Sequence, residues 1–269
     1  MATSRLFSRQ PAVDTGDHLA AICPEHGRYI AALVEQFDGT MQARGCNACR
    51  WAALNLQGAT EEMRLAASES RQQEVLNELL IASGIPPRFI GSTFDSFVAT
   101  EPKAAKVLAA CRGYADDFPR VWDAGRCLIL LGGVGTGKSH LACAIAQAVI
   151  RQHGAQALVV TAAAIVRQAK ATMAKGAQHT EADVIAELVA ASLLIIDEVG
   201  AQRGSEYELG LMHEVIAGRY DRMLPTVVVS NLADDGLAEY IGTRAVDRLR
   251  QNGGKRLTFD WASVRRDGV

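Results

Sequence analysis

Residues 132–139 read Gly132-Gly-Val-Gly-Thr-Gly-Lys-Ser139 and match the phosphate-binding pattern G-x-x-x-x-G-K-[ST] at every fixed position. The glycines allow a tight turn whose backbone N–H groups point into one concavity, which suits a polyphosphate. An apolar run over 127–131 precedes the motif, and residues 140–150 have helical spacing without a breaker. The order of strand, glycine loop and helix places an anion at a helix N-terminus. This stretch therefore predicts a nucleotide-binding α/β fold.

The same loop predicts which residues hold the nucleotide. Lys138 is expected to reach the β- and γ-phosphates, and the Ser139 hydroxyl to ligate Mg²⁺. The predicted loop contribution to nucleotide binding is Gly132, Gly133, Val134, Gly135, Thr136, Gly137, Lys138, Ser139 and His140.

A second motif adds chemistry to binding. Residues 193–198 (LLIIDE) form an apolar strand that ends in two acids, about sixty residues after the loop. In P-loop NTPases an aspartate at this strand end holds Mg²⁺, and Asp197 fits that role. Glu198 is expected to polarise the attacking water, because a neighbouring parallel strand ends beside the γ-phosphate. The pair favours an ATPase over a passive nucleotide binder.

Composition narrows the class of protein. The chain has 269 residues, 49% hydrophobic and 22% charged, which is ordinary for a globular protein with room for one large domain and a small one. A formal net charge of −2 gives no global attraction to nucleic acid. No apolar run is long enough to span a membrane, and the N-terminus lacks a signal-peptide core. We therefore expect a cytoplasmic protein without a membrane partner, whose six cysteines are reduced or metal-bound.

Two residue pairs near the N-terminus have metal-ligand spacing. Cys23 and His26 form C-x₂-H, and Cys46 and Cys49 form C-x₂-C. Such spacing lets both members of a pair reach one tetrahedral ion, and an intervening hairpin can join the pairs. The alternatives are coincidental clustering and a site in which His18 replaces His26. We predict a structural zinc site, since four protein ligands leave no open position.

The chain divides into three predicted parts. Residues 1–57 form a zinc-binding, partner-binding module, residues 58–87 a linker helix that stops at Gly84-Ile-Pro-Pro, and residues 88–269 an ATPase domain. Alternating patterns in the last part predict a parallel sheet between helices. Its expected strands are 127–131, 157–161, 193–197, 226–230 and 256–259, and its expected helices are 139–152, 162–175, 181–190, 206–222 and 233–251.

Taken together, several segments resemble DnaC-type bacterial helicase loaders, which are AAA+ ATPases of the initiator clade related to DnaA and IstB. The resemblance runs from about Gly84 to Arg266 and rests on GGVGTGKSHLACAIA, LLIIDEVGAQ, PTVVVSNL and TRAVDRLRQNGGKRLTFDWASVRR, in the order of that family. It implies an AAA+ P-loop NTPase fold with a three-layer α/β parallel sheet, and ATP as the nucleotide. The small N-terminal zinc-binding module is predicted from the cysteine and histidine spacing and lies outside the resemblance.

The resemblance also implies roles for polar residues that the pattern alone leaves open. Asn231 falls at the sensor 1 position, Arg248 at the arginine finger, with Arg244 one turn before it, and Arg265 at sensor 2. Residues 162–190 fall where the clade carries an insertion that lines single-stranded DNA. Candidate DNA contacts are Lys170, Met173, Lys175, Ser205 and Tyr207, with Tyr207 the better base-stacking candidate.

These expectations combine into one functional hypothesis. The chain is expected to be a DNA-stimulated ATPase that assembles into an ATP-bridged spiral. It would bind a hexameric replicative helicase through the N-terminal module and deliver it onto single-stranded DNA during replication initiation. The first alternative is an IstB-type ATPase that delivers a transposase to target DNA. A second is a zinc-dependent DNA-binding regulator whose ATPase fold acts only as a nucleotide-gated switch.

Overall fold

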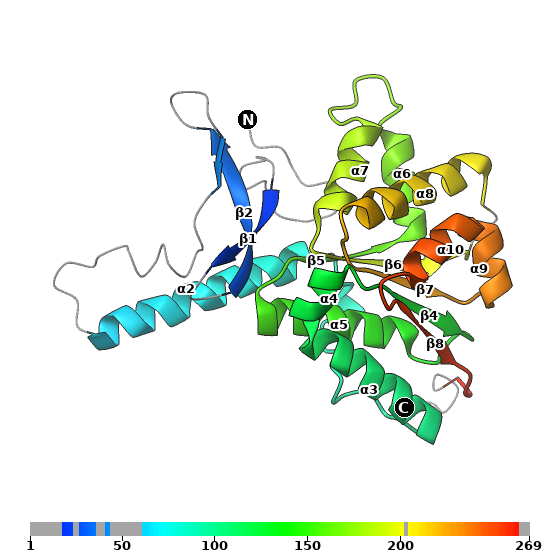
Figure 1. Ribbon diagram of the computed structural model, residues 1–269, viewed down its shortest axis with the longest axis horizontal. Helices are drawn as coiled ribbons and strands as arrows, with labels where there is room; N and C mark the ends of the chain where they lie inside the picture. Colours follow the sequence, from blue (N-terminus) through cyan, green and yellow to red (C-terminus); the bar gives the residue numbers. More distant parts are fainter. Residues whose placement is uncertain (1–17, 24–26, 36–40, 44–60, 202–203, 264–269) are drawn as a thin grey trace.

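The structure is a computed structural model that describes residues 18–23, 27–35, 41–43, 61–201 and 204–263. The first three ranges form a small antiparallel sheet (Figure 1), in which β1 (His18–Cys23) pairs with β2 (Gly27–Glu35) and β2 with β3 (Met41–Ala43). The two long ranges contain the linker helix and the α/β unit.

A five-stranded parallel sheet lies at the centre of the α/β unit. Its order is β5-β6-β7-β4-β8, and the strands are β4 (Leu128–Gly132), β5 (Ala157–Thr161), β6 (Leu193–Val199), β7 (Thr226–Ser230) and β8 (Lys255–Phe259). All five predicted strands are confirmed, with ends shifted by at most two residues. Because β4 lies between β7 and β8, the phosphate loop emerges from the interior of the sheet.

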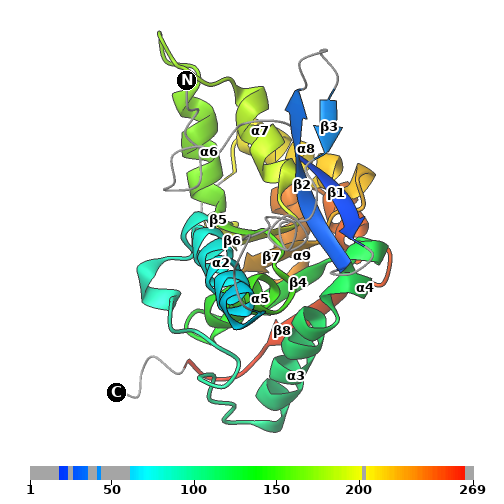
Figure 2. The same cartoon turned by 90° about the vertical axis from the view of Figure 1, so that its left-hand side faces the viewer.

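Helices cover both faces of this sheet and make a three-layer α/β sandwich, as predicted (Figures 1 and 2). Alternate strand residues point to opposite faces: Leu128 and Leu130 pack with α3, α4 and α5, whereas Ile129 and Leu131 pack with α6 to α10. The helices are α2 (Glu61–Ala82), α3 (Pro102–Asp116), α4 (Phe118–Ala124), α5 (Lys138–His153), α6 (Ala162–Ala171), α7 (Glu181–Ala190), α8 (Glu206–Asp221), α9 (Asp234–Ile241) and α10 (Thr243–Arg250).

Three helical predictions need correction. The helix predicted over 162–175 ends at Ala171, so Met173 and Lys175 lie beyond it. The helix predicted over 233–251 is two helices, because the backbone breaks at Gly242, whose φ of 86° is a conformation that favours glycine. Helices α3 and α4 precede β4 where we predicted no element.

The linker helix is joined to the α/β unit at its C-terminal end. Leu76, Leu79 and Leu80 of α2 pack against the core on the α5 side of the sheet, and the Ser83 carbonyl oxygen accepts a 2.7 Å hydrogen bond from Val159 N. Within the described ranges, no helix has the length and apolarity required to cross a membrane.

Candidate nucleotide site

The phosphate loop joins the end of β4 to the start of α5, as the sequence predicts. Gly132 and Gly137 have φ angles of 147° and 92°, and a Cβ at either position would overlap the Phe259 carbonyl oxygen or the Phe97 ring. Both positions therefore require glycine. The Thr136 hydroxyl donates a 2.9 Å hydrogen bond to the Gly133 carbonyl oxygen, which closes the loop on itself.

Lys138 is the first residue of α5, and its side chain lies along the inside of the loop. Its Nζ donates hydrogen bonds of 2.8 Å to the Gly132 carbonyl oxygen and 2.6 Å to the Gly133 carbonyl oxygen. The residue is only 5% exposed, so the ammonium group is held in the loop rather than in solvent. A cation in this position faces the space that a bound phosphate would share with the loop N–H groups.

Asp197 and Glu198 lie at a distortion near the carboxyl end of β6. The register of β6 on β7 shifts between Ile196 and Val199, and Glu198 has a φ of 58°, which is unusual for a residue with a side chain. Its N–H donates a 2.7 Å hydrogen bond to Oδ1 of Asp197. The bulge turns the exposed Glu198 out of the strand, and strain of this kind is common at functional sites.

Ser230, the last residue of β7, ties this bulge to the next strand. Its fully buried hydroxyl donates a 2.6 Å hydrogen bond to the Val199 carbonyl oxygen and accepts one of 3.0 Å from Leu232 N. Asn231, between Ser230 and Leu232, is exposed. The hydroxyl therefore fixes the backbone on either side of Asn231 relative to that of the two acids.

These elements surround one cavity of about 420 Å³. From the predicted set, it is lined by Val134, Gly135, Gly137, Lys138, Ser139, His140, Asp197, Glu198 and Asn231. Gly132, Gly133 and Thr136 form the body of the loop without lining the cavity, and Arg248 and Arg244 lie elsewhere. The cavity combines a cation, a hydroxyl and two carboxylates, which are the groups required to hold a magnesium-bound polyphosphate.

The opposite wall of the cavity is a segment whose role the sequence did not reveal. Residues 84–98, which follow α2, contribute Arg88, Phe89, Ser92, Ser96, Phe97 and Val98 to the lining. We call this segment the strap. Its Pro87–Phe89 part is a short 3₁₀ helix, η1.

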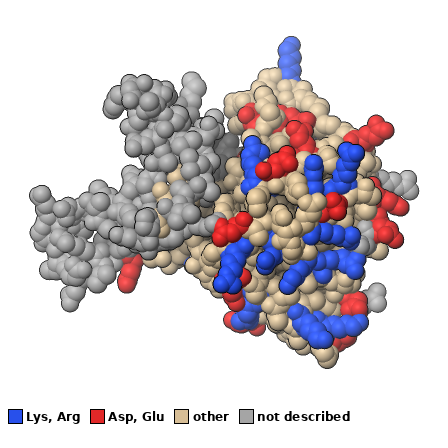
Figure 3. All heavy atoms as spheres, in the orientation of Figure 1, with Lys and Arg blue, Asp and Glu red and all other residues tan. Residues whose placement is uncertain are grey.

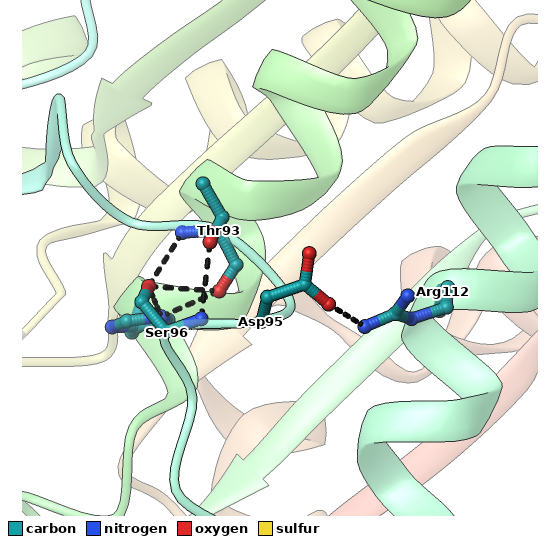
Figure 4. A network of polar contacts seen from close by, with 5 residues as sticks. Thr93, Asp95, Ser96 and Arg112 are labelled. Atoms are coloured by element: carbon teal, nitrogen blue, oxygen red, sulfur yellow. Dashed lines mark hydrogen bonds and ion pairs between the residues drawn. The ribbon is translucent and has the colours of Figure 1, made fainter.

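Side chains of α5 hold the strap through its backbone carbonyl oxygens, and a side chain of α3 holds it through Asp95. Gln147 Nε2 donates hydrogen bonds of 3.0 Å to the Phe89 carbonyl oxygen and 2.7 Å to that of Ser92, and His140 Nε2 lies 2.9 Å from the Thr93 carbonyl oxygen. Figure 4 shows a second attachment, in which Arg112 of α3 pairs with Asp95 at 2.5 Å. His140 therefore lines the cavity and also positions the strap.

In the same view, Thr93 and Ser96 close a tight turn of the strap (Figure 4). The Ser96 hydroxyl accepts a 2.8 Å hydrogen bond from Thr93 N, and the Thr93 hydroxyl accepts one of 3.0 Å from Ser96 N. This reciprocal pair directs Phe97 toward the phosphate loop, where its ring contacts Gly137.

Trp261 is a second residue that sequence reasoning missed. Its Nε1 donates a 3.0 Å hydrogen bond to the Thr136 carbonyl oxygen, and its ring packs on Phe259 with centroids 4.9 Å apart. An ion pair of 2.6 Å between Lys103 and the adjacent Asp260 anchors this segment to α3. The segment after β8 thus supports the phosphate loop through the hydrogen bond to Thr136.

The two predicted arginine sites have different outcomes. Arg248 lies near the end of α10, where its guanidinium contacts Tyr220 at the end of α8. Chain and sheet direction place this contact at the start of β7, whereas Asn231 and the cavity are at the end of that strand. Arg265 lies outside the described residues.

Three of the five candidate DNA contacts have partners within the protein, namely Lys170, Tyr207 and Ser205. Lys170 forms a 3.3 Å ion pair with Glu208, and the Tyr207 hydroxyl donates a short hydrogen bond to Glu181. Partial burial and the nearby Glu181 carboxylate raise the pKa of Tyr207 to about 12. The Ser205 hydroxyl caps α8 by accepting from Glu208 N at 3.3 Å. Met173 and Lys175 are exposed in the turn after α6.

The predicted zinc ligands fall almost entirely outside the described residues. Cys23 is a buried residue at the end of β1, but His26, Cys46 and Cys49 are not described, and His18 begins β1. In the parts of the chain that the structure covers, no cluster of three or more His, Cys, Asp or Glu residues is arranged to hold a metal ion.

Comparison with known proteins gives one consistent result. Residues 56–246 match the family described as IstB-like ATP binding protein. The replicative helicase loader DnaC of Buchnera aphidicola subsp. Acyrthosiphon pisum is 33% identical over 190 residues, which cover 71% of this chain and 76% of that protein. The replicative helicase loader DnaC of Escherichia coli (strain K12) is 28% identical over 257 residues, covering 95% of this chain and 89% of that protein.

Solved structures agree on the fold. A crystal structure of the DnaC helicase loader superimposes with a TM-score of 0.57 at 20% identity and covers 64% of this chain and 99% of that one. The replication initiator DnaA bound to AMPPCP and single-stranded DNA gives a TM-score of 0.54 at 18% identity, covering 66% of this chain and 51% of that one.

Proposed function

Since this chain belongs to the IstB/DnaC-like family of AAA+ ATP-binding proteins, we propose that it is an ATP-dependent loader of a replicative DNA helicase. The observation that carries this proposal is the nearly full-length match to the E. coli loader, which includes the N-terminal region as well as the ATPase unit. A match restricted to the ATPase core would support a transposase-delivering IstB-type protein equally well.

The cavity residues divide the work of ATP hydrolysis. Lys138 would neutralise the β- and γ-phosphates, while Ser139 and Asp197 would hold Mg²⁺. The metal ion, when bound, would offset the charge that builds on the phosphate oxygens. Glu198, turned into the cavity by the β6 bulge, would polarise the attacking water, and the Asn231 amide would orient that water.

The location of Arg248 supports a site completed by a second copy of the chain. Because Arg248 lies near the start of β7 and the cavity at its end, this arginine is poorly placed for its own nucleotide. In a head-to-tail assembly it would reach the γ-phosphate held by the neighbouring copy, where an arginine stabilises the transition-state charge. Arg265 would contact the nucleotide of its own copy as sensor 2. ATP would thus bridge copies into a spiral, and hydrolysis would weaken the bridge.

The remaining proposals concern partners. The N-terminal module, with zinc held by Cys23, His26, Cys46 and Cys49, would grip the helicase. Single-stranded DNA would run along α6 and the start of α8 and stimulate hydrolysis. Tyr207, Lys170 and their neighbours Met173, Lys175 and Ser205 lie in this region. Because two of them are paired with acids, we expect weak DNA binding by a single copy and stronger binding by an assembly.

The test is capture of the partner from host lysate by immobilised protein in the presence of ATP. We expect the wild type to retain a hexameric replicative helicase, identified by mass spectrometry. Immobilised Lys138→Ala protein should retain less of this helicase or none. Selective retention of a transposase would favour the IstB-type alternative. A turnover number near zero that Glu198→Gln leaves unchanged would instead favour the nucleotide-gated regulator.

A further inference from the structure

From the geometry at the end of α10, we infer that Tyr220 is a positioning residue for the arginine that acts on the neighbouring copy. Its ring is the platform on which the Arg248 guanidinium lies. The inference rests on the proposed contact of Arg248 with the nucleotide of the neighbouring copy. It adds the residue that holds the Arg248 side chain in position for that contact.

The platform is a direct contact between two helices. The Arg248 Cζ atom of α10 lies 5.3 Å from the centroid of the Tyr220 ring, which belongs to the last turn of α8. A guanidinium within about 6 Å of an aromatic face is attracted by the ring electrons. The contact holds a long, flexible side chain in one place without help from a carboxylate.

Hydrogen bonds in turn hold the ring. The Tyr220 hydroxyl donates a 2.5 Å hydrogen bond to Gln251 Oε1, and Gln251 Nε2 donates one of 3.0 Å to Asp247 Oδ2. Asp247 and Gln251 flank Arg248 on the same segment. The ring is therefore fixed to the segment whose arginine it supports, so both move together.

Support by a ring leaves the arginine able to bind an anion. Contact with a ring uses the flat face of the guanidinium, whereas phosphate binding uses the N–H groups at its edge. Arg248 is only partly buried and forms no ion pair within the described residues. Its Nη1 has no hydrogen-bond acceptor there, but this nitrogen is buried and is not itself exposed to a neighbouring copy. An acidic partner would have occupied these donors and cancelled the charge.

The surface around this residue suits a negatively charged partner. Lys and Arg side chains gather over α4, α10 and β8 on one face of the molecule (Figure 3), and exposed members near Arg248 are Arg250, Lys255 and Arg256. The mouth of the cavity of a second copy carries Asp197 and Glu198 and would carry the phosphates of ATP. The two surfaces are complementary in charge.

The experiment compares Tyr220→Phe, which keeps the ring, with Tyr220→Leu, which removes it. Steady-state ATP hydrolysis is measured at a protein concentration that supports assembly, with the melting temperature as a check on folding. We expect Tyr220→Leu to lower kcat about tenfold with KM for ATP unchanged, since the lost contact acts only in the assembled site. Tyr220→Phe should retain at least about half of the wild-type kcat, because the ring remains.

An experiment with mixed subunits distinguishes a positioning role of Tyr220 from a folding defect of the variant. Glu198→Gln subunits cannot hydrolyse ATP but present an intact Arg248, so adding them to Tyr220→Leu subunits should restore hydrolysis at mixed interfaces. Recovery above the sum of the two separate activities supports the platform. Failure to recover, or equal losses in Tyr220→Phe and Tyr220→Leu, would overturn it.

Arg248→Ala and the control Arg222→Ala, at an exposed arginine that does not line the cavity, distinguish this inference from the proposed function on which it rests. If Arg248→Ala hydrolyses ATP like the wild type, the trans role of Arg248 is wrong and the proposed bridging mechanism fails. If Arg248→Ala is inactive but Tyr220→Leu is not, only the platform is refuted. Arg222→Ala should remain close to wild type in either case.

Discussion

Arg219 provides the most demanding test of how this fold holds its candidate DNA-binding helices. The residue is fully buried in the last turn of α8. Its guanidinium donates to the carbonyl oxygens of three residues at the end of α7 and to two groups at the start of β7. The acceptors are Leu188, Val189 and Ala191 at 2.9, 3.2 and 2.8 Å, Pro225 at 2.6 Å and the Thr226 hydroxyl at 2.9 Å.

The Arg219→Met variant keeps the side-chain length and removes all the donors. Three carbonyl oxygens at the end of α7 lose this partner, at about 2 kcal/mol each, or about 6 kcal/mol in all. Burial lowers the pKa of Arg219 from 12.5 to about 10. The lowered pKa means that burying the charged guanidinium destabilises the folded state by about 3 kcal/mol, at about 1.36 kcal/mol per pKa unit. The methionine variant does not have this cost. We therefore expect a net destabilisation of about 3 kcal/mol.

Thermal unfolding followed by circular dichroism would measure the effect. A loss of about 3 kcal/mol should lower the melting temperature by about 6–12 °C in a domain of this size. The matched control is Arg222→Met, which removes an exposed arginine three residues later and should shift the midpoint by about 1 °C or less.

Arg219→Lys tests the reason for the effect. A single ammonium cannot reach both the end of α7 and the start of β7, so lysine should not restore the wild-type midpoint. Full restoration by lysine would mean that charge alone matters. A melting temperature of Arg219→Met within 1 °C of wild type would refute the role of this arginine as a pin between the two elements.

Three further predictions concern the site and its partners. Trp261→Phe keeps an aromatic ring but removes the indole N–H that the Thr136 carbonyl oxygen accepts, so ATP binding measured by fluorescence titration should weaken about fivefold, whereas Trp122→Phe should not change it. Glu208→Gln releases Lys170 and should tighten binding of a labelled oligo-dT about two- to fivefold at low salt, with Glu206→Gln as the control; unchanged affinity would argue against competition between Glu208 and DNA. Removal of zinc by a chelator should reduce helicase capture while leaving ATP hydrolysis intact, and a metal analysis without zinc would end that proposal.

Much of the α/β unit could be predicted because its determinants are local. Each buried parallel strand is a short apolar run, and the phosphate loop and the Asp197–Glu198 pair follow directly from two such runs. The carboxyl ends of parallel strands share one sheet edge, so the meeting of Lys138, Asp197 and Asn231 in one cavity also follows from the pattern.

The missed features depend on contacts between distant parts of the chain. The strap is held by backbone carbonyl oxygens that Gln147 and His140 reach from more than forty residues away, and carbonyl oxygens leave no trace in a sequence. Lys170 appears as a free cation in the sequence, because its partner Glu208 lies 38 residues later. Gly242 ends a helix through its own φ angle, and a glycine inside a helical pattern is a break signal that the sequence does carry.

Helix α8 joins the cavity of one copy to the site that this copy would complete on its neighbour. It begins at Glu206, shortly after Glu198, and its 16 residues extend for about 24 Å to the turn that contains Arg219 and Tyr220. Arg219 points inward and fixes the end of the helix to α7 and β7, while Tyr220 supports Arg248. Loss of the Arg219 hydrogen bonds should therefore disturb the contact between Tyr220 and Arg248 more than the nucleotide cavity. At a temperature where Arg219→Met remains folded, we expect KM for ATP to stay near wild type while kcat falls. Arg219 and Tyr220 are adjacent residues at the end of α8, so a disturbance of one should reach the other. A change in KM without a change in kcat would show that this end of α8 does not influence the nucleotide site of the neighbouring copy.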